Sequence, residues 1–232
     1  MSAMTANPRV TSLPVAAARI AAAAFCLAVV AGCGIVPKKE TISIYAPETH
    51  VQPDPAWPTV KWQLQIPRPH ASDLLDSSRI VVRPADGELQ VYHGATWATP
   101  VPDLVQDAVL EAFEDSGRIA GVTRRGAGVS GDYALLLDIR RFDSDYAGGK
   151  VPNAEVQIVA KVLANDSNQV IATRMLHKTV AADGVAVAEV SRALGRALND
   201  AMQELVGWTL VETQKFDQAR PAPATTPPAR KR

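Results

Sequence analysis

The amino-acid sequence predicts an α+β fold, in which a single mixed, mostly antiparallel sheet has two amphipathic helices packed on one face. Alternating apolar and polar residues, typical of half-buried strands, recur in segments between residues 41 and 179. Two other segments place apolar residues three or four positions apart, as amphipathic helices do. Because each helix has one apolar face, we expect both to cover the same side of the sheet.

Four short strands are predicted in the first half of the chain, at residues 41–45, 61–66, 79–83 and 88–92. Prolines break regular structure in the loop between the first two strands. The dipeptide Asp86-Gly87 separates the last two strands and favours a hairpin turn.

The first helix is predicted to begin within residues 99–103, where proline fits the first turn and Asp103 suits the positive end of the helix. The pair Ser116-Gly117 is expected to end this helix. A short strand at residues 119–123 and a glycine-rich loop then lead into the second half.

Three longer strands and a closing helix are predicted in the second half. The strands are expected at residues 133–142, 154–163 and 170–179, with a hairpin turn rich in Asn, Asp and Ser before the last. The closing helix is expected from Val187 to Val206, with Gly207 as its stop. The folded domain is therefore predicted at residues 41–210, followed by a disordered, proline-rich tail at residues 211–232.

The N-terminus carries the pattern of a secretion signal. Arg9 and Arg19 precede an apolar run at residues 20–31, which is shorter than the roughly 20 residues of a membrane span. Its length suits the h-region of a signal peptide. The sequence Val30-Ala31-Gly32-Cys33 resembles a bacterial lipobox. We therefore predict a lipoprotein signal peptide at residues 1–32 and a lipidated tether at residues 33–40, the alternative being an ordinary signal peptide with a chance cysteine.

Lipidation would use the cysteine that remains after processing. Cys33 would carry covalent lipid, with palmitate among its acyl chains, while Cys26 would leave with the signal peptide. The mature domain would then have no cysteine for a disulfide or for catalysis. Gly34 stands where an aspartate would retain a lipoprotein at the inner membrane, so we expect anchoring at the periplasmic face of the outer membrane.

Motifs for nucleotide, nucleic-acid or metal chemistry are missing from the sequence. The chain contains no G-x-x-x-x-G-K-[ST] motif, so it is not expected to be an ATPase. Its formal net charge is zero, which gives no basis for binding nucleic acid. Its four histidines are scattered at His50, His70, His93 and His177. No cofactor or metal is therefore expected.

Two short patterns only partly match catalytic or metal-binding motifs. The stretch around Ser130 resembles a nucleophile elbow but lacks the last glycine and precedes a strand, so a hydrolase is the least favoured alternative. Asp143 and Asp145, followed by two glycines, faintly resemble a calcium loop without its later ligands, so we expect a solvated turn. The protein is therefore not expected to be an enzyme.

Tyr92 and Trp97 are the candidate contacts for a partner protein or lipid. Both lie between a predicted strand and the first helix. The favoured interpretation is that Trp97 packs on the start of that helix, which would account for it without any partner. A contact with a partner protein or with lipid is the other interpretation.

The lipobox is followed by "ISIYAPE" and then by "LQIPRPHASDLLDSSRIVVRPADGELQVYHGATWATPVPDLVQDAVLEAF". These passages resemble the ABC-type transport auxiliary lipoprotein family, through the "R-P-x-x-x-x-L-Q-x-Y" pattern, the tryptophan and the "P-x-P-x-L-V-Q" helix start. Later, "ALLLDIRRFDSD" and "RALGRALNDAMQELVGWTL" resemble the family's central strand and closing helix. The resemblance covers residues 41–210, and the proline-rich tail departs from it.

This resemblance implies an accessory role in envelope transport. Members are outer-membrane-anchored periplasmic lipoproteins encoded with a permease, an ATPase and a mammalian-cell-entry (MCE) domain protein. The implied partners are the MCE protein, its ABC permease/ATPase complex and outer-membrane lipid, and a homo-oligomer is a further option. The alternatives are an independent lipid carrier, with a cavity between the strand at residues 133–142 and the helices, and a periplasmic hydrolase.

Overall fold

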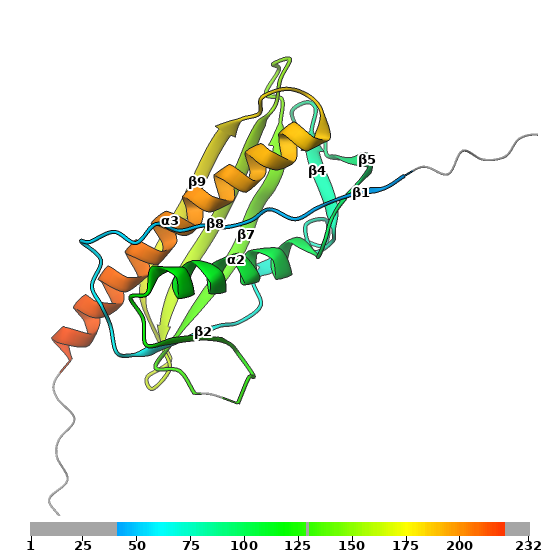
Figure 1. Cartoon of the computed structure of the whole chain (residues 1–232). Helices are drawn as coiled ribbons and strands as arrows, with labels where there is room; N and C mark the ends of the chain where they lie inside the picture. Colours follow the sequence, from blue (N-terminus) through cyan, green and yellow to red (C-terminus); the bar gives the residue numbers. More distant parts are fainter. Residues whose placement is uncertain (1–40, 129, 221–232) are drawn as a thin grey trace, which may run out of the picture. The chain divides into compact units, whose positions relative to one another are not determined.

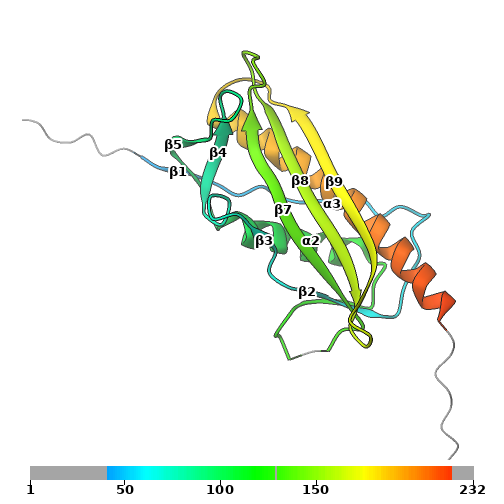
Figure 2. The same cartoon turned by 180° about the vertical axis from the view of Figure 1, so that it is seen from behind.

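The computed structural model describes residues 41–128 and 130–220 (Figure 1). Of these, residues 42–128 and 130–220 belong to one folded unit. Nine strands join in one sheet, and helices α2 and α3 both cover the same face of it, as Figures 1 and 2 show from opposite sides. The predicted α+β class and the placement of the helices are therefore confirmed.

The first half of the fold forms the predicted short strands and the first helix. Strand β5 extends further than expected, and a two-residue strand, β3, was not predicted. The elements are β1 (Ser43–Tyr45), β2 (Gln63–Ile66), β3 (His70–Ala71), β4 (Arg79–Arg83), β5 (Gln90–Trp97) and α2 (Val101–Ser116).

Helix α2 begins and ends as the sequence predicted. Pro100 is its N-cap residue, and Asp103 lies in the first turn. Gly117 ends the helix with φ 57°, a left-handed conformation that glycine adopts without a steric cost.

Strand β7 (Tyr133–Asp145) lies at the centre of the sheet. It pairs antiparallel with β8 (Asn153–Ala164), which pairs antiparallel with β9 (Gln169–Ala181). Along its other edge it pairs in parallel with β2, β3 and β4. The predicted hairpin of β4 and β5 is antiparallel, while β1 joins β5 and the short β6 (Gly121–Arg124) joins β2, both in parallel.

A single core fills the space between the sheet and the two helices. On β7, Leu135 and Ile139 are at most 2% exposed, and they belong to the same apolar cluster as Phe113 of α2 and Leu194 of α3. The cavity that a lipid carrier would need between β7 and the helices is therefore occupied by packed side chains.

Helix α3 (Val187–Ala219) is longer than predicted, so the expected stop at Gly207 is wrong. Gly207 is instead needed for packing: because it has no side chain, the Trp57 ring can lie against the helix there. A Cβ built on Gly207 would lie only 2.8 Å from Trp57 Cε2. Beyond it Leu210 is buried, and Phe216 stacks edge-on against Tyr133 with ring centroids 6.5 Å apart. Residues 211–219, which we assigned to the tail, are thus helical, and residues 221–232 lie outside the described part of the chain.

Gly207→Ala is expected to destabilise the protein, although alanine in a helix interior normally gains about 1 kcal/mol over glycine. The added methyl group would collide with the Trp57 ring, and such overpacking costs about 1–3 kcal/mol. Urea unfolding of the mature protein in detergent measures the difference. In a Trp57→Ala background the same substitution should become stabilising, and stabilisation in both backgrounds would contradict this account.

Candidate functional site

The predicted lipidation site, Cys33, lies outside the described residues, as do Cys26 and the whole signal peptide. Lipidation therefore stays a prediction. The other two candidate residues, Tyr92 and Trp97, are both described, and the structure places them near β7.

Trp97 is a core residue. It is 1% exposed, and its ring meets Phe142 of β7 edge-on, with centroids 5.6 Å apart and planes at 71°. An indole in this position cannot reach a partner protein or lipid while the domain is folded. The structure therefore favours the packing interpretation for Trp97, with Phe142 of strand β7 as the ring that the indole meets.

Tyr92 is half-buried at the edge of the same region. Its hydroxyl lies 3.0 Å from Oγ of Ser144, which is fully buried on β7. Burial raises the pKa of the Tyr92 phenol above its ordinary value, so the side chain is neutral at physiological pH. This hydrogen bond ties β5 to β7 and leaves only part of the ring for an outside contact.

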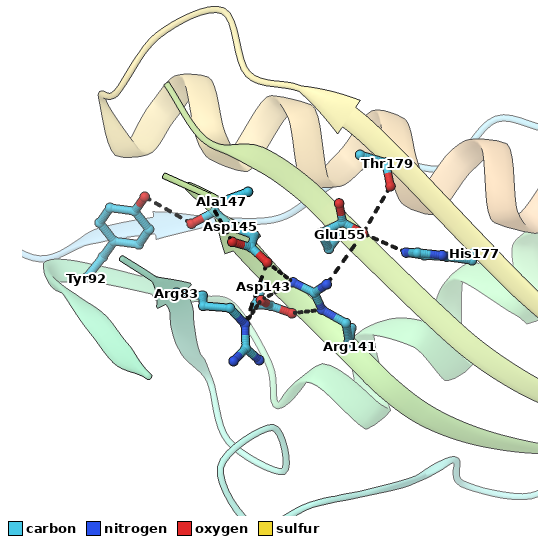
Figure 3. Close-up of polar contacts among 10 residues, drawn as sticks. Arg83, Tyr92, Arg141, Asp143, Asp145, Ala147, Glu155, His177 and Thr179 are labelled. Carbon is cyan, nitrogen blue, oxygen red and sulfur yellow. Dashed lines mark hydrogen bonds and ion pairs between the residues drawn. The ribbon is translucent and has the colours of Figure 1, made fainter. Parts of the chain in front are cut away.

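An ionic cluster that the sequence did not predict lies on the open face of the sheet, away from the helices (Figure 3). The Arg141 guanidinium donates to both carboxylate oxygens of Asp143, at 3.0 and 2.9 Å, and to Asp145 at 2.8 Å. Arg83 of β4 approaches the same two carboxylates at 3.6 and 3.7 Å. The Asp143 side chain is only 4% exposed, so two arginines from neighbouring strands neutralise a nearly buried charge.

The cluster continues across β8 and β9 through Glu155, whose side chain is 10% exposed. Oε2 of Glu155 accepts a hydrogen bond from the Thr179 hydroxyl at 3.0 Å and lies 2.6 Å from Nε2 of His177. Arg141 Nη1 lies 3.8 Å from the same oxygen. One network of side chains therefore connects four neighbouring strands.

This network corrects the interpretation of Asp143 and Asp145 as a solvated turn. Both lie on β7, where arginines hold them in place of a metal ion. Burial raises the pKa of the Asp145 carboxyl, but hydrogen bonds from Arg141 and from the Ala147 amide outweigh it and hold that pKa below its ordinary value. The alternation Arg141-x-Asp143-x-Asp145 was a local signal of one shared face, whereas Glu155 and His177 join only through strand register.

A surface groove of about 690 Å³ lies between helix α3 and the chain segment that follows β1. This segment, residues 46–62, crosses the outer side of the helices in Figure 1, and we call it the strap. The groove is bounded by residues of both, with the end of β9 beside them. They include Tyr45, Pro47, His50, Val180, Ala188 and Asn199.

Side-chain amides of α3 hold the strap in place. The His50 amide donates to Asn199 Oδ1 at 2.8 Å, and one turn later Gln203 exchanges two hydrogen bonds with the backbone of Gln52. A Cβ on Gly195 would lie 3.3 Å from the Pro47 Cβ, so the strap and the helix are nearly in contact there. The groove therefore has one wall that is anchored at a few defined points.

Ser130 is the serine of the hydrolase alternative. Ser130 is exposed in the loop before β7. Within residues 41–128 and 130–220 no hydrogen bond joins it to a histidine, and His177 and His70 instead face Glu155 and Asp138.

Two features are absent from the described residues. No helix among them is long and apolar enough to cross a membrane. No group of three or more His, Cys, Asp or Glu side chains in the described ranges could hold a metal ion.

The folded unit thus combines a sheet with one helix-covered face, one open face and a groove beside the strap. The sequence profile of the family described as "ABC-type transport auxiliary lipoprotein component" matches residues 41–206, and the chain belongs to this family. The resemblance seen in the sequence is therefore confirmed, and the family is one of transport components rather than of enzymes.

Two solved structures and one curated relative are similar to this chain. A crystal structure of a Xanthomonas campestris protein, described as belonging to family DUF330, is 46% identical, with a TM-score of 0.72 over 76% of this chain and 99% of that one. An uncharacterized protein of known structure shares the fold at 14% identity, with a TM-score of 0.56 over 72% of this chain and 97% of that one. An uncharacterized protein of Bradyrhizobium diazoefficiens is 28% identical over 180 residues, 78% of this chain, which spans 47% of that protein's length.

Replacing Arg141 with alanine is expected to destabilise the domain by about 2 kcal/mol, because it leaves Asp143 and Glu155 nearly buried without their main cation. The cost stays below the roughly 3–5 kcal/mol of a fully buried pair, since the Arg141 side chain is 25% exposed. Thermal or urea unfolding at neutral pH measures it.

The neighbouring substitution Arg140→Ala is the control, because that side chain is 58% exposed and its ion pair with Asp138 should contribute under about 0.5 kcal/mol. Since the pKa of Asp145 is depressed in the folded state, its contribution is complete above its unfolded pKa and is lost as the pH falls toward the folded value. The difference between the two variants should therefore shrink in acid. Equal effects of both substitutions at neutral pH would refute this role of the cluster.

Proposed function

We propose that this protein is a periplasmic accessory lipoprotein of an MCE-type ABC transport system, anchored by lipid on Cys33 to the outer membrane. It docks the MCE-domain protein and assists the passage of lipid across the envelope. The observation that carries this proposal is the family match over residues 41–206, beginning eight residues after a lipobox cysteine. The ABC permease and ATPase supply the energy, for which this chain has no nucleotide-binding motif.

Docking also suits the surfaces of the domain. The open face of β7–β9 carries charged side chains with which a partner could form ion pairs. The groove beside the strap offers an apolar recess. Tyr92 remains a candidate for a partner or lipid contact, whereas Trp97 contributes only by stabilising the core of the domain.

Covalent crosslinking in intact cells, followed by purification of the tagged protein from membranes, tests the proposed partners. We expect the MCE-domain protein in the crosslinked fraction, together with components of the ABC complex. Recovery of the lipoprotein without any of these proteins would argue strongly against the docking role.

Cys33→Ala is expected to give an unprocessed precursor that fails to reach the outer membrane, because the lipid is both the processing signal and the anchor. Membrane fractionation and the mass of the protein measure both effects. Cys26→Ala is the matched control and should be processed normally, since that residue lies in the segment to be removed. Normal cleavage and outer-membrane binding of the Cys33→Ala protein would overturn the anchor.

A second candidate function is that of an independent lipid carrier, and the groove of about 690 Å³ favours it because ligand sites usually measure about 300–1,000 Å³. Native mass spectrometry should then find lipid bound to the domain. Ala188→Trp, which narrows the groove, should remove that lipid, and Ala219→Trp on an exposed position of the same helix should not. Lipid retention in both variants would exclude the groove as the carrier site.

A further inference from the structure

Three turns of the domain emerge from the same end of the sheet. The strand register aligns Arg83 with Asp145, Asp145 with Asn153, and Asn153 with Ala181, so four strand ends lie in one row. Backbone hydrogen bonds from Tyr146 to Arg83 and from Ala182 to Pro152 continue this row beyond the strands. The turns that follow, residues 84–89, 146–152 and 182–186, form the upper end of the domain in Figures 1 and 2, which we call the turn end.

Each of these turns exposes one large apolar side chain. Leu89 is 46% exposed, Val151 45% and Val185 55%. Isolated exposed apolar residues are common on protein surfaces, but three on adjacent turns at one end form a group. None of the three belongs to the hydrophobic core or packs against it, and each lies outside the sheet and the helices.

The opposite end of the domain has a different chemistry. Its hairpin turn is Asn165-Asp166-Ser167-Asn168, and its loop before β7 combines glycine with Arg125 and Asp132. Among the described residues, none in these two connections is a large exposed hydrophobic, and the nearest one, Val170, lies on strand β9. Among the described residues, the turn end therefore exposes more large apolar side chains in its turns than the opposite end does.

The chain enters the domain in the half that carries the turn end. Strand β1 pairs with the last residues of β5, which begins beside the turn end and runs along β4. Ile42 and Ile44 of β1 are 61% and 68% exposed, and Val91 of β5 is 39% exposed. The nine Cα–Cα steps from Cys33 to Ile42 span at most about 30 Å, whereas strand β7 alone is about 40 Å long. A lipid on Cys33 would thus keep this half of the domain close to the membrane.

We infer that the turn end rests on the lipid surface, with Leu89, Val151 and Val185 inserted among the headgroups. This inference rests on the proposed lipidation of Cys33. Short apolar side chains on separate turns suit the shallow interface of a bilayer, while a protein partner is usually met by one continuous patch. Helix α3 begins directly after the third turn, so the groove beside it would open close to the membrane.

The charges at the turn end indicate which force would hold it on the lipid surface. Asp86, Glu88 and Asp183 outnumber Lys150 on the three turns, so attraction to anionic headgroups is not the driving force. Apolar insertion is only weakly sensitive to salt. We therefore expect the contact on zwitterionic vesicles and at high ionic strength.

Single-cysteine variants of the lipidated protein test this orientation directly, because the mature chain has no cysteine beyond Cys33, whose thiol the lipid would occupy. Val151→Cys and Val185→Cys, each labelled with an environment-sensitive fluorophore, are reconstituted on phosphatidylcholine vesicles that contain brominated lipid. Met175→Cys and Val170→Cys on β9 are matched controls with 60% and 46% exposure of the native residue. Quenching at the turn end should be roughly twofold stronger or more than at β9, and unchanged in high salt.

Vesicle flotation of the same samples distinguishes failure of the lipid anchor from failure of the turn-end contact. Protein that does not float shows that the lipid anchor itself, and with it the proposed function, has failed. Protein that floats but is quenched equally at all four positions overturns the turn-end contact alone. Protection of positions 151 and 185 only when the MCE-domain protein is added, without quenching by brominated lipid, would assign the turn end to a protein partner and also overturn it.

Discussion

The fold depends on strand β7, which has one apolar face and one charged face. One face carries Leu135, Ile139 and Phe142 into the core below the helices, while Arg141, Asp143 and Asp145 lie on the open face. Because β7 also forms ladders with β2, β3, β4 and β8, the sheet cannot shift its register without turning both sets over. The ion pairs from Arg83 and Arg141 make the second face compatible with near-burial of Asp143, so the sheet needs no second layer there.

Local patterns in the sequence were sufficient to predict the class of fold and most of its elements. Strand alternation and the glycine at position 117 depend on neighbouring residues, which is why β7, β8 and α2 were predicted within a few positions. The parallel pairs between β7 and the first-half strands join residues distant in sequence and carry no local signal. Gly207 was mistaken for a helix stop because the ring that requires a glycine there, Trp57, lies 150 positions earlier in the sequence.

The candidate site was less predictable than the family. The tryptophan at position 97 helped to identify the family, yet its ring serves the core by packing on Phe142. Residues that recur for packing identify a fold more reliably than they identify a contact with a partner. The cluster of Arg141, Glu155 and His177 was missed because its members meet only through the register of β7, β8 and β9.

The position of the membrane determines which faces of the domain remain free for a partner. If the turn end rests on lipid, the strands stand away from the bilayer, and neither sheet face is covered by it. The helix-covered face carries the strap, held by Asn199 and Gln203, and its groove would open beside the lipid surface. The open face would point sideways, with its ionic cluster near the membrane and Met175 further out on β9. The open face would then be available for a protein partner, while the groove would be placed to receive lipid from the bilayer.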